Sequence, residues 1–199
     1  MAIYAFNSGI PLLTTERLRL RQLNMRDAED IVRYSRDPLV AKYVLWQAHS
    51  NIGDSRAYIR YMMHAYRTGE PSSWGIEYAK YRRIIGTIGF MWIQNSNSCA
   101  EVGYSLAREY WNQGIMTEAL SEVIRYGFEE LRLNRIEAIH EPDNAASGAV
   151  MQKCGMLYEG YQRQKLLNKG KYVDVKLYAI LRQDWKKLRT ARDFPGSSS

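Results

Sequence analysis

Apolar and polar positions change period near residue 110, and the change predicts a strand followed by a helix. In the predicted strand Cys99–Leu106, Val102, Tyr104 and Leu106 lie two residues apart. After Gly114, apolar residues recur every three or four positions, as on one face of a helix. This stripe consists of Met116, Ala119, Leu120, Val123, Ile124, Gly127, Phe128 and Leu131. We therefore expect a strand, a glycine turn and a helix packed against a core.

The remaining segments predict further strands and helices. Strands are expected at residues 17–23, Ser73–Tyr78, 84–93, Arg135–His140, 156–163 and 173–181. Helices are expected at residues 25–35 after the cap Asn24, at 55–68 and at 145–154, with a loosely helical stretch from Asp37 to Trp46. The strands in residues 73–106 form a predicted antiparallel meander. An α/β (α+β) fold with a mixed, mostly antiparallel central sheet flanked by helices is the packing we expect.

Length and composition indicate one globular domain. The chain has 199 residues, of which 46% are hydrophobic, and we place the domain at residues 1–195. We interpret residues 196–199, Gly-Ser-Ser-Ser, as a disordered tail or a cloning remnant. No stretch approaches the roughly 20 apolar residues that cross a bilayer, and the first residues do not resemble a secretory signal. We therefore expect a cytoplasmic protein without a membrane partner.

The cysteines and histidines do not indicate a metal site. Cys99 and Cys154 lie in a predicted strand and a predicted helix without ligand-like spacing, so we expect both to be small buried residues. His49, His64 and His140 are spread along the chain, apart from any cluster of carboxylates or cysteines. We expect no bound metal.

The charge of the chain says little about its binding partners. The chain has 28 basic and 21 acidic residues, which gives a formal net charge of +7. Basic residues cluster at 80–83, 169–171 and 186–192. Such a surface could approach ribosomal RNA or acidic proteins, or it could serve solubility alone. We favour a solvated surface and expect no specific nucleic-acid partner.

The turn at Gly114 is a candidate anion site. The first amides of a helix have no internal partner, and the positive end of the helix dipole adds to their attraction for phosphate. Glycine lets the backbone of this turn approach a ligand without a Cβ in the way. The alternative is that Gly114 only makes a tight connection from strand to helix.

A second candidate turn follows the predicted strand Arg135–His140. Glu-Pro-Asp breaks the alternation, and a short helix begins near Ala145 and is closed by Gly155. Asn144 and Ser147 lie at the start of this helix, where they can cap it, contact a ligand or do both.

Four sequence blocks, in this order, resemble the GCN5-related N-acetyltransferase (GNAT) superfamily, especially its ribosomal-protein N-terminal acetyltransferases typified by RimJ and RimL. The blocks are residues 14–21 (TTERLRLR), 100–104 (AEVGY), 110–119 (YWNQGIMTEA) and 144–147 (NAAS) followed by 153–156 (KCGM). Together they span nearly the whole chain. The resemblance implies acetyl-CoA as co-substrate and a cofactor cleft where two neighbouring strands part.

The resemblance also implies which residues hold acetyl-CoA. The backbone of residues 113–117 would bind the pyrophosphate, and Asn144 and Ser147 would meet the pantetheine arm. The implied cofactor residues are Leu106, Trp111, Asn112, Gln113, Gly114, Ile115, Met116, Thr117, Asn144 and Ser147. The family pattern has Arg or Gln three residues before the glycine and Gly or Ala two after it, where this chain has Trp111 and Met116. Met116 must therefore turn into the core or crowd the cofactor.

Acetyl transfer to an amine needs one group that takes the amine proton and one that protonates the departing thiolate. Glu101, on the strand that borders the expected cleft, is our candidate base, and its alternative is a solvated or ion-paired strand carboxylate. Ser147 could donate to the leaving sulfur, a part that Tyr158 or Tyr161 could also play. The resemblance implies backbone amides around residues 104–106 as donors to the thioester carbonyl. Because no histidine partner is evident for either cysteine, we expect direct attack by the amine.

The acceptor amine is less defined. An α-amino group has a pKa near 8, so about a tenth is neutral at pH 7, whereas lysine, near 10.4, offers less than about a thousandth. We therefore expect a protein N-terminus, ribosomal by resemblance. The alternatives are a small amine, antibiotic or amino acid in the same cleft, and a CoA-binding sensor or basic RNA-associated module without turnover. A homodimer is an open expectation.

An aromatic-rich region precedes and enters the meander. Its members are Tyr43, Trp46, Tyr58, Tyr61, Tyr66 and Trp74. Such residues usually pack in a core, but by the resemblance part of this region closes over the acceptor. Acidic residues of the helices at 25–35 and 55–68 that face the cleft would favour a cationic small molecule, whereas an open basic rim would favour a protein.

Overall fold

An eight-stranded sheet organises residues 9–193, the part of the chain that the computed structural model describes. The strand order is β1-β2-β3-β4-β5-β6-β8-β7, and neighbours are antiparallel except for β5 and β6. The strands are β1 Leu13–Thr14, β2 Leu18–Arg21, β3 Ser73–Tyr78, β4 Arg83–Gln94, β5 Cys99–Leu106, β6 Arg135–His140, β7 Leu157–Asn168 and β8 Lys171–Leu181. The mixed, mostly antiparallel sheet predicted from the sequence is confirmed.

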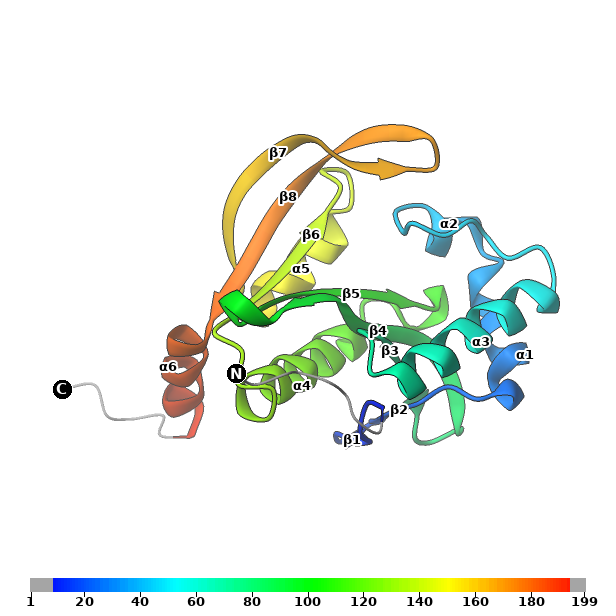
Figure 1. The fold of residues 1–199 in the computed structure, drawn as a ribbon, viewed down its shortest axis with the longest axis horizontal. Coiled ribbons are helices and arrows are strands. Elements are labelled where there is room, and N and C mark those ends of the chain that lie inside the picture. Colours follow the sequence, from blue (N-terminus) through cyan, green and yellow to red (C-terminus); the bar gives the residue numbers. More distant parts are fainter. Residues whose placement is uncertain (1–8, 194–199) are drawn as a thin grey trace.

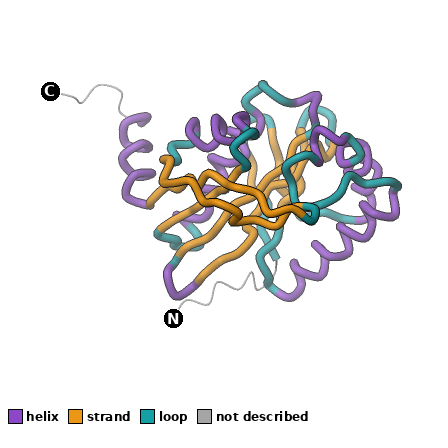
Figure 2. The backbone as a smooth tube through the Cα atoms, turned by 90° about the horizontal axis from the view of Figure 1, so that it is seen from above, coloured by secondary structure: helices purple, strands orange, loops and turns teal. Residues whose placement is uncertain are grey.

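Helices flank these strands (Figures 1 and 2). They are α1 Ala28–Ser35, α2 Pro38–Ala41, α3 Ile52–Thr68, α4 Ile115–Glu129, α5 Ala145–Lys153 and α6 Arg182–Asp193. Short 3-10 turns occur at η1 Met25–Asp27, η2 Asn95–Asn97 and η3 Arg108–Tyr110. α1 packs against α3 and β4, whereas α5 packs beside α4, β6 and β7.

The core lies where the predicted apolar faces meet. Leu18 and Leu20, at alternate positions of β2, are fully buried. The predicted stripe of α4 is buried as well, and Leu131, just beyond the helix, is partly buried against the same core. The ring of Trp74 in β3 contacts Tyr126 of α4 edge-on, with centroids 5.6 Å apart. These contacts fix α4 against the sheet and thereby place its first turn.

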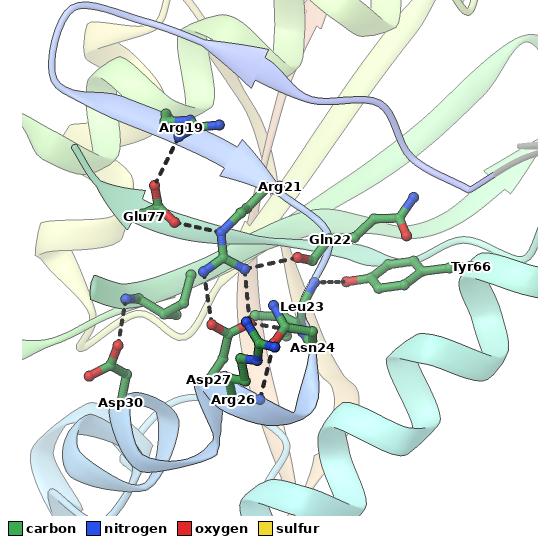
Figure 3. A network of polar contacts seen from close by, with 11 residues as sticks. Arg19, Arg21, Gln22, Leu23, Asn24, Arg26, Asp27, Asp30, Tyr66 and Glu77 are labelled. Atoms are coloured by element: carbon green, nitrogen blue, oxygen red, sulfur yellow. Dashed lines mark hydrogen bonds and ion pairs between the residues drawn. The ribbon is translucent and has the colours of Figure 1, made fainter. Parts of the chain in front are cut away.

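Arg21 ties β2 to the first helical segment (Figure 3). Its guanidinium donates to both carboxylate oxygens of Asp27, at 2.9 and 2.8 Å, and its Nε donates to Glu77 of β3 at 2.6 Å. The hydrogen bond with Asp27 is the main reason that the pKa of Arg21 lies above its ordinary value. Asn24 and Asp27 also form a capping box at the start of η1, which confirms the predicted cap.

β7 and β8 form a long hairpin that projects from the sheet (Figure 1). The strands predicted at residues 156–163 and 173–181 were too short, because the polar residues between them resembled a loop. The hairpin turns through Lys169 and Gly170, whose φ angles of 50° and 81° are typical of a two-residue turn matched to strand twist. At this tip the Lys169 ammonium donates to the carbonyl oxygens of Ala41 and Lys42, at the end of α2.

Two helices differ from their predictions. α3 begins at Ile52 rather than at residue 55, because Asn51 and Asp54 form a capping box there. α6 was not predicted, since its sequence is mostly polar, and it is held by the ring of Trp185 against Phe128 at a centroid distance of 5.5 Å. The single domain expected at residues 1–195 stays a prediction, and the expected tail at 196–199 lies outside the described residues.

β5 and β6 part after a short stretch of parallel pairing. Only Cys99, Ala100 and Glu101 of β5 pair with β6. Beyond Glu101, β5 continues along β4 while β6 continues along β8, and the two strands diverge (Figure 1). Within residues 9–193 no other strand pairs with that side of β5. A gap therefore opens in the sheet from Val102 onward.

Candidate active site

A cavity of about 330 Å³ lies at the gap between β5 and β6. Part of its wall is β5 from Glu101 to Ser105 together with Asn144 and Ser147 at the start of α5. Another part consists of aromatic and apolar residues from α3 and from the segment 43–46 before it. Three predicted site residues, Glu101, Asn144 and Ser147, therefore border one space.

Gly114 is the N-terminal cap of α4 and has a left-handed backbone, with a φ of 74°. No side chain caps this helix. The first bond into the helix runs from the Glu118 amide to the Gly114 carbonyl oxygen at 3.0 Å, so the amides of residues 115–117 have no helical partner. The turn has the free amides that the predicted anion site requires, and its ligand stays a prediction.

The two departures from the family pattern have structural explanations. Met116 is 6% exposed and belongs to the core, so its side chain does not crowd the turn. The indole N–H of Trp111 donates to the carbonyl oxygen of Leu106 at 2.8 Å. Trp111, which stands where the family pattern has Arg or Gln, therefore connects the turn to the end of β5.

Arg17 lies beside the same turn and was not among the predicted site residues. Its Nη1 donates to the carbonyl oxygen of Gln113 at 3.0 Å, and its Nε donates to Glu118 at 2.7 Å. Its Nη2 lies 3.6 Å from the position that a Cβ on Gly114 would take. The chain thus places a guanidinium next to the free amides, although Arg17 and Gln113 are 96 positions apart. In the sequence, only the family-like block at residues 14–21, which contains Arg17, pointed to this part of the chain.

Glu101 faces the cavity from the last position of β5 that pairs with β6. Burial raises the pKa of its carboxyl, the Trp92 indole lowers it in part, and the nearby Glu137 raises it further. Among residues 9–193 no basic side chain lies within ion-pair distance of Glu101. A carboxylate with a raised pKa is a better proton acceptor than an ordinary one, which suits the predicted role.

Asn144 caps α5, because its side-chain oxygen accepts a hydrogen bond from the Ser147 amide at 3.3 Å. The predicted capping role is confirmed. The Ser147 hydroxyl lies 2.9 Å from the hydroxyl of Tyr104, which also donates to the Ser147 carbonyl oxygen at 3.2 Å. Burial raises the pKa of Tyr104 well above its ordinary value, so its hydroxyl stays protonated. Sequence reasoning considered only the backbone of Tyr104 and missed this contact.

The other candidates from the sequence lie elsewhere. Tyr158 and Tyr161 are exposed on β7 and do not line the cavity, and the Tyr161 hydroxyl donates to Asp174 at 2.5 Å. Cys99 and Cys154 are buried, as predicted, and neither forms a disulfide. Within the described ranges, no helix is both long and apolar enough to cross a bilayer. In residues 9–193, no three His, Cys, Asp or Glu side chains are grouped so as to hold a metal ion.

Residues 17–157 match the model of the acetyltransferase (GNAT) domain. The chain belongs to the GNAT family. It is 34% identical over 173 residues to the "Uncharacterized N-acetyltransferase p20" of Bacillus licheniformis, covering 87% of this chain and 97% of that relative. It is 28% identical to the ribosomal protein uS5-alanine N-acetyltransferase of Escherichia coli (strain K12), covering 92% and 98%. A solved GNAT acetyltransferase from Bacillus anthracis matches with a TM-score of 0.77 at 28% identity, over 87% of this chain and 99% of that chain.

As a GNAT protein, the chain is an acetyltransferase, and the family uses acetyl-CoA. The resemblance found in the four blocks is confirmed, including the ribosomal-protein acetyltransferase branch. The matched GNAT region contains β5, the turn at Gly114 and the start of α5. Most of the cavity wall and the candidate anion site therefore lie within the shared domain, whereas the lining residue Leu166 lies beyond it.

Proposed function

We propose that the protein transfers the acetyl group of acetyl-CoA to the N-terminal α-amino group of a protein, with ribosomal proteins as the first candidates. One observation carries the proposal: Glu101 and the hydrogen-bonded pair of Tyr104 and Ser147 border the same cavity. A proton acceptor and a proton donor thus lie around one reaction space, in the gap where β5 and β6 part.

The turn before α4 supplies groups for the pyrophosphate of acetyl-CoA. Asn112 and Gly114 both have positive φ angles, of 59° and 74°, and such curvature turns successive amides toward one point. The amides of residues 115–117 add the positive end of the helix dipole. Arg17 adds a guanidinium beside them. These groups fit an anion, and Gln113 shapes the turn through its carbonyl contact with Arg17.

The gap in the sheet fits the rest of the cofactor. The free side of β5, ending at Leu106, offers backbone groups to the amides of the pantetheine arm, and Asn144 borders the same cavity. Bound acetyl-CoA supplies an activated acetyl group as a thioester. The protein orients that thioester toward Glu101 and keeps the reaction in a partly enclosed space.

Proton transfers by the chain's own residues complete the reaction. The nitrogen of the neutral amine forms a bond to the acetyl carbon while the carbon–sulfur bond breaks. Glu101 takes the proton that makes the bound acceptor an ammonium, directly or through water, and the proton that the nitrogen loses on forming the amide passes to solvent. Ser147 gives a proton to the departing sulfur and regains one from Tyr104, and solvent restores Glu101 and Tyr104. Since a thiol has a pKa of about 8.5, this donation matters only modestly.

The cavity lining supports a protein acceptor over a polycationic small molecule. Glu101 is the only carboxylate among the lining residues that the structure describes, so the acidic residues of α1 and α3 do not face this space. The uS5-alanine N-acetyltransferase relative, by its name, acts on a ribosomal protein. A cytoplasmic location belongs to the same proposal, and homodimer formation stays a prediction.

Release of free thiol from acetyl-CoA tests the proposal. We expect peptides with a free N-terminus to stimulate release, and the same peptides with a blocked N-terminus to have no effect, even when they contain lysine. Mass spectrometry of a lysate treated with labelled acetyl-CoA would then name the acceptor. If the protein binds acetyl-CoA but no acceptor stimulates thiol release, the proposal fails and the protein is a CoA-binding sensor. Stimulation by small amines alone would leave the small-molecule alternative.

A further inference from the structure

Four aromatic side chains from one region of the chain line the cavity. Trp46 comes from the segment before α3, and Tyr58 and Tyr61 come from α3 itself. Tyr43 closes the space toward the α5 side, because its hydroxyl donates to the Asp143 carbonyl oxygen at 3.3 Å. The other two aromatic residues of the region, Tyr66 and Trp74, are buried in the core.

Tyr58 and Tyr61 belong to α3 and line the cavity away from the start of α5, whereas Tyr43 contacts Asp143 just before that helix. α3 and α5 are clearly apart in Figure 1, and the cofactor residues Asn144 and Ser147 belong to the start of α5. Leu45, Met62 and Leu166 add further apolar surface to the cavity. The part of the space that the proposed pantetheine site does not use is therefore mainly apolar and aromatic.

The charge of the lining is limited to one residue. Within the part of the lining formed by residues 9–193, Glu101 is the only carboxylate, and no lysine or arginine is present. His140 also lines the space, and burial lowers its pKa, so its ring is neutral near pH 7. The cavity can pair with one ammonium group. Among the described lining residues it has no second carboxylate for another positive charge and no basic side chain for a free carboxylate.

Several polar groups of the cavity lining are neutral hydroxyls. The Thr87 and Ser105 hydroxyls lie 3.1 Å apart and bond to each other. Tyr58 lies beside Thr87 and Ser73, and burial raises its pKa, so it stays protonated. The hydroxyls of Thr87, Ser105 and Tyr58 already have partners within the protein, so a ligand need not supply a charged group to pair with them.

We infer that the acceptor's N-terminal residue carries an aromatic or large apolar side chain that packs among Trp46, Tyr58 and Tyr61 while its ammonium faces Glu101. The inference rests on the proposed function and adds which kind of first residue the acceptor protein has. Burial of an aromatic ring against other rings is favourable in such a site. A peptide meets the charge requirement better than a free amino acid, because its first residue has an amide in place of a carboxylate.

A peptide series that differs only in its first residue tests the inference. The probes are peptides beginning with Phe, Leu, Ala, Lys or Glu, measured by thiol release as kcat/KM. We expect Phe and Leu to exceed Ala by about tenfold or more, as hydrophobic pockets discriminate by that order, with Lys and Glu lower still. An Ala or Lys peptide equal to or faster than the Phe peptide would overturn the inference while leaving the proposed function in place. If no peptide stimulates release, the proposed function fails and the inference falls with it.

Free phenylalanine and phenylalaninamide give a second comparison. They share the ring and differ in the carboxylate, for which no described lining residue is a basic partner. The two amines differ in pKa, so each rate is divided by the neutral fraction of its amine. The corrected rate should be at least about tenfold higher for the amide, the cost expected for an unpaired charge in a partly enclosed site. Equal rates would contradict the charge argument.

A variant separates side-chain recognition from general damage. Tyr61→Ala should lower the ratio of kcat/KM between the Phe and Ala peptides, because Tyr61 is in the lining. Tyr172→Ala is the matched control, since Tyr172 is exposed on β8 and outside the lining. The control should keep the ratio of the unaltered protein. An unchanged ratio in Tyr61→Ala, with normal thermal unfolding, would overturn the assignment of this wall.

Discussion

A Cβ built on Gly148 would lie 2.7 Å from the Nε2 of His140. His140 is buried at the end of β6, and its Nδ1 lies 2.7 Å from the Glu141 carbonyl oxygen, so the ring is held in place. α5 can therefore approach β6 this closely only because residue 148 is glycine. The approach in turn places Ser147 beside Tyr104.

Gly148→Ala should destabilise the protein by about 1–3 kcal/mol, the usual cost of overpacking a core. Alanine's better helix propensity, worth up to about 1 kcal/mol, offsets only part of this. Urea unfolding measures the change. Gly160→Ala is the matched control, because a Cβ there meets no atom within 4 Å, and it should change stability by less than about 0.5 kcal/mol. Equal stability of both variants would contradict the steric argument.

Tyr104→Phe should lower kcat by about 2- to 12-fold, which corresponds to the loss of one ordinary hydrogen bond of about 0.5–1.5 kcal/mol. The phenyl ring keeps the packing but removes the hydroxyl that contacts Ser147. The KM for acetyl-CoA should change little. Steady-state kinetics at saturating peptide measures both constants.

The double variant Tyr104→Phe with Ser147→Ala tests whether the two hydroxyls act together. If Tyr104 acts through Ser147, its substitution should have little further effect once the serine hydroxyl is absent. Effects that multiply independently would show that Tyr104 does not position Ser147 for proton transfer.

Glu101→Gln should lower kcat/KM most at low pH. Below the pKa near 8 of an α-amino group the acceptor is mostly protonated, and the variant has no carboxylate to take that proton. At higher pH the amine is neutral, so the variant and the unaltered enzyme should converge. Thiol release measured from roughly pH 6 to pH 9 gives the profile. The same factor of loss at every pH would indicate a structural role.

The stability of the Glu101 variant provides its control. Burial raises the pKa of Glu101 in the folded state, so its ionised form destabilises the fold. That destabilisation is present above the folded pKa and disappears as the pH falls below the ordinary pKa. Glu101→Gln should therefore unfold at a higher temperature than the unaltered protein at pH 7, with the difference lost near about pH 4. A lower unfolding temperature at pH 7 would show that the kinetic loss reflects damage.

Gly114→Asp should raise the acetyl-CoA Kd more than Gly114→Asn does. Both side chains have the same size, and both tolerate the left-handed backbone that Gly114 adopts, with a φ of 74°. They differ in charge, so the comparison isolates repulsion of a bound anion. Titration calorimetry at low and high salt measures it, because salt should reduce the difference. Equal Kd values for both variants would argue against a phosphate at this turn.

Arg17→Gln should raise the acetyl-CoA Kd by about tenfold or more, as expected for the loss of a charge-assisted hydrogen bond. Arg17 contacts the turn through Gln113, and its Nη2 lies near Gly114. Arg19→Gln is the matched control, because Arg19 occupies the next outward position of the same segment and is paired with Glu77. The two variants should not weaken binding equally, and if they do, Arg17 has no special role at the turn.

Local patterns predicted the elements that their own residues determine. The strand Arg135–His140 alternates strictly, and its residues face opposite sides of the sheet as expected. Asn24 and Asn144 were identified as caps because a short polar side chain before an apolar run satisfies free amides locally. These predictions needed no knowledge of distant parts of the chain.

Contacts between distant segments could not be predicted. Tyr104 and Ser147 are 43 positions apart, and their contact depends on how far α5 packs toward β5. Arg17 begins the strand predicted at residues 17–23, and nothing in the neighbouring residues indicates Gln113 as its partner. α6 was missed because its sequence is mostly polar, and the contacts that fix it, such as Trp185 with Phe128 and Arg182 with the Leu133 carbonyl oxygen, join it to distant residues.

The parallel ladder between β5 and β6 is only three residue pairs long. Extending it past Glu101 would add hydrogen bonds and strengthen the sheet, but it would also close the space that a thioester needs. Selection for thermal robustness and selection for turnover therefore oppose each other at this point. A variant engineered for a higher unfolding temperature should therefore be stabilised in the outer strands, with the pairing of β5 and β6 still ending at Glu101.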